Sequence, residues 1–129
     1  DLFMKMGTDR ALALVAHDGM KPLMCTFVKN NEDAITAQNL ACTGTTGKLL
    51  QQTCPGVHVA HTMPSGPLGG DAVLGKLIQE KKVWGVFFFT DPLTAQPHFY
   101  DIVSLCRLCD MHQVFFCMNY RTADAMLKF

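Results

Sequence analysis

Four aspartate and two histidine residues stand where apolar segments of the chain give way to polar ones: Asp18, Asp71, Asp91, Asp101, His17 and His98. A carboxylate beside a phosphorylated carbonyl compound can take a proton from the carbon next to the carbonyl group, and an imidazole can polarise the carbonyl oxygen. Each aspartate taken alone is more simply interpreted as a helix N-cap. Taken as a set, these residues predict acid–base chemistry on a small molecule.

The segment 42–50, CTGTTGKLL, places glycine, threonine and lysine directly before an apolar run. If a helix begins here, its free backbone N–H groups can hold one phosphate, together with the hydroxyls of Thr43, Thr45 and Thr46. The alternative is that a threonine caps the helix and no ligand binds.

The glycine spacing in this segment excludes two common nucleotide motifs. Gly44 and Gly47 are too close for GxxxxGK[ST], and the segment does not match the dinucleotide fingerprint GxGxxG. A second glycine-containing turn contains Ser65 and Gly66, and Lys21 supplies a compact positive charge. Because two loops of this kind are present, we expect a phosphate group to bind between them.

These residues need elements that bring them together, and the hydrophobic pattern supplies alternating strands and helices. It predicts strands at 11–17, 39–43, 57–63, 83–90 and 114–119, and helices at 18–31, 44–54, 69–82, 98–113 and 121–129. This alternation predicts an α/β fold: a three-layer, doubly wound, Rossmann-type domain with a five-stranded, mainly parallel sheet. In such folds the ligand lies beyond the carboxyl ends of the strands, which is where the polar residues fall.

Composition limits the class of protein. The 129 residues are 49% hydrophobic and 17% charged, as expected for one globular domain. The 11 basic and 11 acidic residues cancel, which argues against a nucleic acid or an anionic membrane as partner. No apolar run approaches the roughly 18 residues that a membrane span needs.

The six cysteines are expected to be reduced and mostly buried, because they lie among large apolar residues: Cys25, Cys42, Cys54, Cys106, Cys109 and Cys117. Cys106 and Cys109 form a CxxC pair, but there is no second pair to complete a metal site. His58, His61 and His112 are assigned no chemical role. We therefore predict no metal and no cofactor.

Four motifs occur together in this chain: VAHDGMK at 15–21, CTGTTGK at 42–48, SGPLGGD at 65–71 and DPLTAQPHFYDI at 91–102. In order and spacing they resemble the methylglyoxal synthases, and NYRTAD at 119–124 extends the resemblance over almost the whole chain. The resemblance implies conversion of dihydroxyacetone phosphate to methylglyoxal and inorganic phosphate without a cofactor.

The resemblance also implies roles for individual residues. Asp71 matches the base that takes the proton from C3, His98 matches the residue that hydrogen-bonds the enediolate, and Asp101 is its neighbour. His17, Asp18 and Asp91 match the remaining catalytic positions. The positions that match substrate or phosphate binders are His17, Lys21, Thr43, Gly44, Thr45, Thr46, Ser65 and Gly66.

The family implies a cytoplasmic homohexamer that inorganic phosphate inhibits, often cooperatively. It also implies a short C-terminal segment beyond the single domain 1–129. Two alternatives share the superfamily: a phosphate- or nucleotide-sensing domain without activity, as in carbamoyl phosphate synthetase, and the cyclohydrolase domain of purine synthesis. Because Asp71, Asp91 and His98 are all present, the sequence favours the enzyme.

Overall fold

The computed structural model describes residues 9–65, 69–94 and 102–128. Its elements, in chain order, are β1 (Ala11–Ala16), the short 3-10 turn η1 (Asp18–Met20), α2 (Lys21–Asn30), α3 (Glu32–Thr36), β2 (Asn39–Thr43), α4 (Gly44–Thr53), β3 (His58–Met63), α5 (Gly70–Gln79), β4 (Val83–Phe89), α6 (Ile102–His112), β5 (Phe115–Cys117) and α7 (Tyr120–Lys128).

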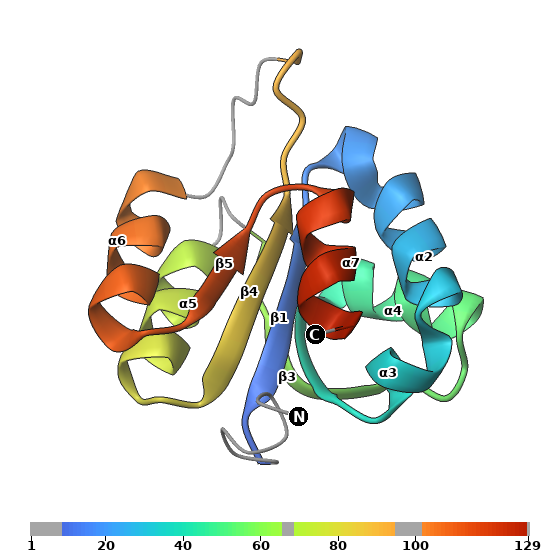
Figure 1. The fold of residues 1–129 in the computed structure, drawn as a ribbon, viewed down its shortest axis with the longest axis horizontal. Coiled ribbons are helices and arrows are strands. Elements are labelled where there is room, and N and C mark those ends of the chain that lie inside the picture. The colour runs from blue at the N-terminus through green and yellow to red at the C-terminus, as the bar shows by residue number, and fades with distance from the viewer. Residues whose placement is uncertain (1–8, 66–68, 95–101, 129) are drawn as a thin grey trace.

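The strands form one sheet in the order β3-β2-β1-β4-β5, with every neighbouring pair parallel. Helices α2, α3, α4 and α7 cover one face, and α5 and α6 cover the other (Figure 1). The chain moves outward from β1 to β3 and then returns to the other side of β1. This arrangement confirms the predicted three-layer, doubly wound α/β fold.

Side chains of the central strands alternate between two cores, as the period of a β-strand requires. Leu12 and Leu14 of β1 face one core, and Ala13 and Val15 face the other. The β4 strand is buried along its whole length, as expected for a strand with helices on both sides.

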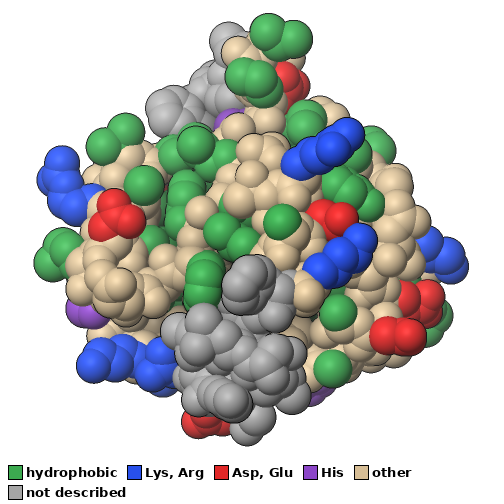
Figure 2. All heavy atoms as spheres, in the orientation of Figure 1, with side chains coloured by type: hydrophobic (Ala, Val, Ile, Leu, Met, Phe, Trp, Pro, Cys, Tyr) green, Lys and Arg blue, Asp and Glu red, His purple; other side chains and the backbone are tan. Residues whose placement is uncertain are grey.

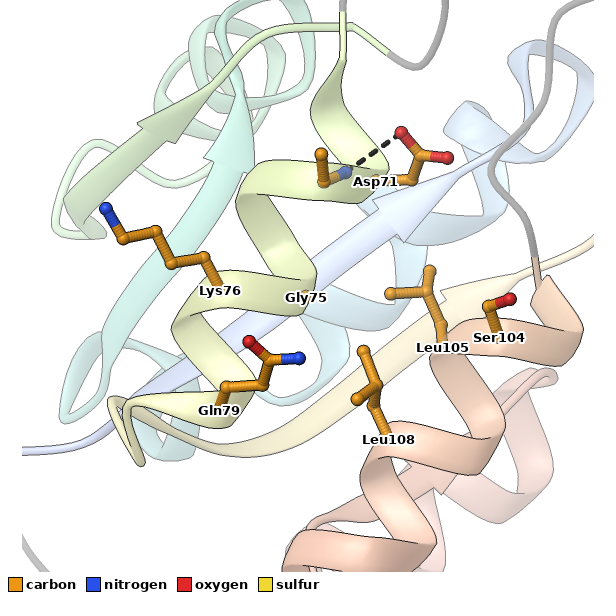
Figure 3. Close-up of a pocket in the computed structure, with 8 residues that line it drawn as sticks. Asp71, Gly75, Lys76, Gln79, Ser104, Leu105 and Leu108 are labelled. Atoms are coloured by element: carbon orange, nitrogen blue, oxygen red, sulfur yellow. Dashed lines mark hydrogen bonds between the residues drawn. The ribbon is translucent and has the colours of Figure 1, made fainter.

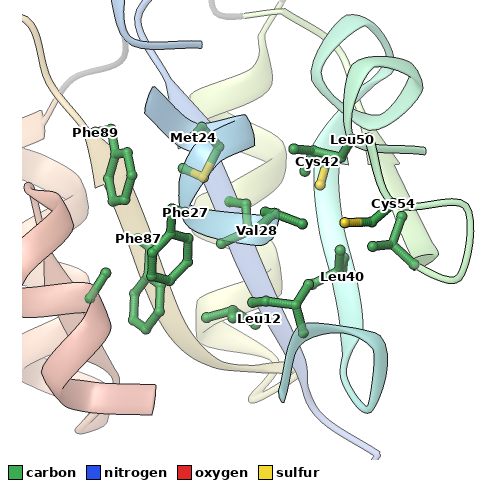
Figure 4. Packing of buried hydrophobic residues seen from close by; sticks show 14 of the residues in the cluster. Leu12, Met24, Phe27, Val28, Leu40, Cys42, Leu50, Cys54, Phe87 and Phe89 are labelled. Carbon is green, nitrogen blue, oxygen red and sulfur yellow. The ribbon is translucent and has the colours of Figure 1, made fainter. Parts of the chain in front are cut away.

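Aromatic rings fill much of the core beneath α2 (Figure 4). Phe27 makes edge-to-face contacts with Phe87 at 5.9 Å and with Phe89 at 5.4 Å between ring centroids. Tyr120 of α7 contacts the same Phe27 ring at 5.4 Å. Burying a side chain of this size contributes about 1.5–3 kcal/mol, so these contacts hold α2 and α7 firmly on the sheet.

Helices α5 and α6 each end in a Schellman motif, with a non-glycine residue in the left-handed conformation. After α5, Lys81 has φ 59°, and the N–H of Lys82 donates to the carbonyl of Leu77 at 2.9 Å. After α6, Gln113 has φ 56°, and the N–H of Val114 donates to the carbonyl of Cys109 at 2.9 Å. The prediction of a helix up to residue 82 was therefore too long, because the motif reverses the chain there.

The hydrophobic pattern did not predict α3, a short helix with acidic residues in its first turn. The last strand is also shorter than predicted, at three residues. The start of the predicted helix 98–113 lies partly outside the described residues, which resume at Ile102.

The cysteines are free thiols, as expected, and four of the six are buried: Cys42, Cys54, Cys109 and Cys117. Burial raises the pKa of Cys42 to about 12, so this thiol stays protonated. Among the described residues, no helix combines the length and apolar character that crossing a membrane requires.

Candidate active site

The carboxyl ends of all five strands lie at one edge of the sheet, at the top of Figure 1. Register brings the last residues of neighbouring strands level, with Ala16 beside Phe89 and Thr43 beside Met63. His17 follows β1 directly and Asp91 follows β4 after one further residue. The order of strands reverses between β1 and β4, which is where ligands bind in such sheets.

His17 and Asp91 are joined across this point. The main-chain N–H of Asp91 donates a hydrogen bond to Nδ1 of His17 at 2.9 Å. The main-chain N–H of His17 donates to the carbonyl of Phe89 at 3.1 Å, and the imidazole meets the Phe88 ring edge-to-face at 5.3 Å. Since Nδ1 accepts, a neutral His17 carries its proton on Nε2.

The other ring nitrogen of His17 is buried and lacks a hydrogen-bond partner within the described part of the chain. Burial lowers the pKa of His17 below 6.5, and this effect outweighs the carboxylates of Asp91 and Asp18, which raise it. The imidazole is therefore neutral near pH 7, with an N–H donor that a bound ligand can satisfy.

Asp18 and Lys21 form an ion pair in the turn that leads from β1 into α2. Lys21 Nζ lies 2.9 Å from Asp18 Oδ1, and 24% of the Lys21 side chain is exposed compared with 96% for Asp18. The hydrogen bond and the charge of Lys21 hold the pKa of Asp18 below its ordinary value. The turn thus presents one cation at the carboxyl edge with a carboxylate beside it.

The glycine–threonine segment begins α4, as predicted. Thr43 is the N-cap: its Oγ1 accepts the N–H of Thr46 at 3.4 Å and lies 3.0 Å from the Thr46 hydroxyl. Thr43 and Thr46 are buried, whereas Thr45 is exposed and Gly44 is half-buried. Two of the three hydroxyls therefore hold the turn together, while the Thr45 side chain is exposed.

A second turn leads from β3 into α5. The N–H of Gly70 donates to the carbonyl of Ser65 at 3.0 Å, which closes the turn. Gly69 has φ 94°, a conformation that L side chains rarely adopt, so a glycine is required there. Gly66 lies outside the described residues.

Asp71 lies in the first turn of α5, where its Oδ1 accepts the N–H of Ala72 at 2.9 Å (Figure 3). The residue is half-exposed and borders a cavity of about 350 Å³ between α5 and α6. Leu105 and Leu108 of α6 line the opposite wall of this cavity. Among the described residues, no hydrogen bond or ion pair joins Asp71 to His17 or to the Thr43–Thr46 turn.

The structure therefore groups the predicted residues in three places along one edge: His17 with Asp91 and the ion pair Asp18–Lys21, the start of α4, and the start of α5. His98 and Asp101 lie outside the described residues. Asn119, which follows the last strand, caps α7: its Oδ1 accepts from the N–H of Thr122 at 2.9 Å and from its hydroxyl at 3.1 Å. Its contacts give it a structural role.

Sequence reasoning identified Asp91 as a carboxylate and missed its main-chain N–H as the partner of His17. No side-chain pattern reveals a backbone donor. Over the ranges described, the side chains of His, Cys, Asp and Glu form no group of three or more that could hold a metal ion.

Residues 23–118 match the family described as MGS-like domain. Methylglyoxal synthase of Borreliella afzelii (strain PKo) is 41% identical over 93% of this chain and 93% of its own length. That of Acholeplasma laidlawii (strain PG-8A) is 45% identical over 91% of this chain and 94% of its own. The crystal structure of methylglyoxal synthase from Elizabethkingia anophelis NUHP1 superposes with a TM-score of 0.85 at 39% identity, covering 95% of this chain and 79% of that one. The chain belongs to the methylglyoxal synthase family.

Proposed function

We propose that this protein converts dihydroxyacetone phosphate to methylglyoxal and inorganic phosphate. The observation that carries the proposal is the similarity to methylglyoxal synthases, at 41% and 45% identity over more than nine-tenths of each chain. The grouping of acid–base residues and a phosphate-type helix start at one sheet edge supports it.

The reaction needs one base and no outside oxidant or reductant. The base removes a proton from C3 of the substrate, and the electrons form an enediolate across C3 and C2. The C1–O bond then breaks, the bonding pair leaves with phosphate, and the enol of methylglyoxal remains. This enol gains a proton at C1 and becomes methylglyoxal.

Asp71 is our proposed base. It stands at the amino end of α5, half-exposed, with one carboxylate oxygen held by the N–H of Ala72. This bond orients the carboxylate and leaves Oδ2 to approach the substrate, as a general base requires.

His17 is our proposed neutral hydrogen-bond donor to a substrate oxygen. Its Nδ1 is occupied by the N–H of Asp91, and its buried Nε2–H is without a partner in the described part of the chain. A fixed donor of this kind stabilises developing negative charge without having to reorganise. By resemblance, His98 and Asp101 complete the set at the enediolate.

The start of α4 is our proposed phosphate site, with Gly44, Thr45 and the cation of Lys21 as contacts. Helix amides and a lysine are common partners of phosphate. The orientation in which the phosphate is held also determines whether the enediolate loses phosphate. If the C1–O bond stands perpendicular to the enediolate plane, its breaking orbital overlaps the π system and phosphate leaves; a bond in the plane does not break.

We further propose a cytoplasmic homohexamer that inorganic phosphate inhibits. The family resemblance supports all three features. Light scattering after size exclusion tests the assembly, and activity at increasing phosphate concentration tests the inhibition.

The deciding experiment incubates the protein with dihydroxyacetone phosphate and measures methylglyoxal and phosphate separately. We expect equal amounts of the two products. Asp71→Asn should lower kcat by about 10²–10⁴-fold, because general base catalysis contributes that much. Asp33→Asn, an exposed residue in the first turn of α3, serves as the control and should keep full activity.

Two results would contradict the proposal. Phosphate released without methylglyoxal would indicate a phosphatase. A folded protein that binds phosphate and forms neither product would indicate the sensing alternative.

A further inference from the structure

Gly19 lies in the turn η1, within the VAHDGMK motif, but the resemblance gives it no role of its own. Among the described glycines only Gly69 has a positive φ, so the backbone at Gly19 does not require glycine. The space around Gly19 provides a different reason for a glycine there.

The space over Gly19 is taken by one group. A Cβ built on Gly19 would lie 2.8 Å from Oδ2 of Asp91 and 3.8 Å from its Cγ, and no other described residue beyond the two chain neighbours of Gly19 comes within 4 Å. Real Cβ atoms essentially never lie within 3.0 Å of such a neighbour. The Asp91 carboxylate therefore occupies the volume that any other residue at position 19 would fill.

The Asp91 carboxylate is held in that place from its own side as well. Its Oδ1 accepts the N–H of Leu93 at 3.2 Å, so Oδ2 is the oxygen that faces Gly19. The N–H of the same residue holds His17. One residue thus connects the end of β4 to the end of β1 twice, through its backbone and through its carboxylate.

We infer that Gly19 is a positioning residue, whose missing side chain lets the Asp91 carboxylate lie against the η1 turn beside His17. The inference rests on the proposed function, in which His17 and Asp91 belong to the active site. Gly19 itself contacts no reacting atom; it acts through Asp91.

This role separates activity from stability. A carboxylate is the end of a short, rotatable side chain and can move away from a new methyl group at small cost. To go from 2.8 Å to the 3.4 Å of an ordinary contact, it must move by about 0.6 Å. Displacements of about 1 Å in an active site can cost up to about 100-fold in rate. Gly19→Ala should therefore fold normally and lose about tenfold or more in kcat/KM.

The test compares wild type, Gly19→Ala, Asp91→Ala and the double variant in the synthase assay. With no carboxylate to displace, the methyl group should have no further effect, so Asp91→Ala and the double variant should have equal kcat/KM. Gly56→Ala is the matched control. Its Cβ would meet a Thr36 methyl at 3.3 Å, away from the carboxyl ends of the strands, and kcat/KM should not change.

A second measurement does not depend on turnover. Among the described residues, the charged groups that act on His17 are Asp91 and Asp18, and its ring packs on Phe88. The titration of the His17 ring, followed by ¹⁵N NMR, should shift when Gly19→Ala is made in wild type and should not shift in Asp91→Ala.

The outcomes are distinguishable. Equal shifts in both backgrounds, or none in either, would overturn the role of Gly19. A Gly19→Ala protein with wild-type kcat/KM would do so too. A wild-type protein that makes no methylglyoxal would instead overturn the proposed function, and the NMR comparison would still decide the contact.

Discussion

The main-chain N–H of Asp91 and Nδ1 of His17 lie 2.9 Å apart, although the two residues are 74 positions apart in the sequence. This bond joins the residues that follow β1 and β4, two neighbouring strands, at the point where the strand order reverses. Because it takes up Nδ1, the neutral ring must present its N–H on the opposite side. A backbone hydrogen bond thus determines that the neutral His17 ring offers the proton on Nε2.

The acid sensitivity of the protein should depend on His17. Burial keeps its pKa below the ordinary value of 6.5, so on acidification the unfolded chain takes up a proton before the folded chain does. The contribution of this residue to the free energy of unfolding is therefore full above pH 6.5 and declines as the pH falls below it.

Urea unfolding at about pH 7.5 and about pH 5.5 measures this effect against His17→Gln, which cannot titrate. The wild type should lose more stability between the two conditions than the variant. Equal losses would show that the buried ring does not control the acid limb.

Thr43 and Thr45 should separate stability from phosphate binding. Thr43 caps α4 and is buried, so Thr43→Val should lower the free energy of unfolding by about 1 kcal/mol. Thr45 is exposed, so Thr45→Ala should change stability by less than about 0.5 kcal/mol.

For phosphate binding, in contrast to stability, the exposed Thr45 should be the threonine that matters. Loss of a hydrogen bond from the Thr45 hydroxyl to a charged ligand is worth about 1.5–3 kcal/mol, or at least about tenfold in the dissociation constant of inorganic phosphate by calorimetry. Thr53→Val, at the far end of the same helix, is the control and should bind phosphate normally. Unchanged affinity in Thr45→Ala would remove this hydroxyl from the site.

Asn119 should matter for folding and little for turnover. Its side chain caps α7 through Thr122, so Asn119→Ala should cost about 1 kcal/mol of unfolding free energy. Asn119→Asp keeps the acceptor and should stay close to wild type. A large loss of kcat in Asn119→Ala, with stability intact, would instead place this residue in the catalytic machinery.

Lys81→Gly should stabilise the protein. Lys81 has φ 59° at the end of α5, a conformation that costs an L-residue about 1–2 kcal/mol, and glycine adopts it freely at a smaller entropic cost. The net gain in unfolding free energy should be about 0.5–1 kcal/mol.

Gln113→Gly should gain less, because the Gln113 side chain donates to the carbonyl of Asp110 at 3.0 Å and this bond would be lost. Lys82→Gly is the control next to Lys81 and has no positive φ to relieve. If Lys82→Gly stabilises as much as Lys81→Gly, the conformation of Lys81 is not the cause.

The order of strands and helices followed from hydrophobic period, because strands buried on both faces read as apolar runs and the helices between them are amphipathic. The run 83–89 and the strand 39–43 were predicted to within a residue. The end of α5 was not predicted, because Lys81 and Lys82 are compatible with a helix. The left-handed conformation of Lys81, which ends the helix, is visible only in the structure. The short α3 has too few turns to show a period.

The candidate site, too, has features that the sequence predicted and features that it could not predict. Side-chain types identified the phosphate-type turn and the acid–base residues, since chemistry restricts which residues can serve. The pairing of His17 with a backbone N–H and the space over Gly19 depend on how β1 and β4 approach one another. Such facts exist only once the sheet has formed.

The position of β1 has a consequence for the resistance of the site to local unfolding. This strand is hydrogen-bonded to β2 on one side and β4 on the other, so its amides should exchange with solvent only when much of the sheet opens. The turn that carries His17, Asp18, Gly19 and Lys21 continues directly from it. The outer strands β3 and β5 can therefore unfold locally many times while β1, which supports that turn, remains hydrogen-bonded in the sheet.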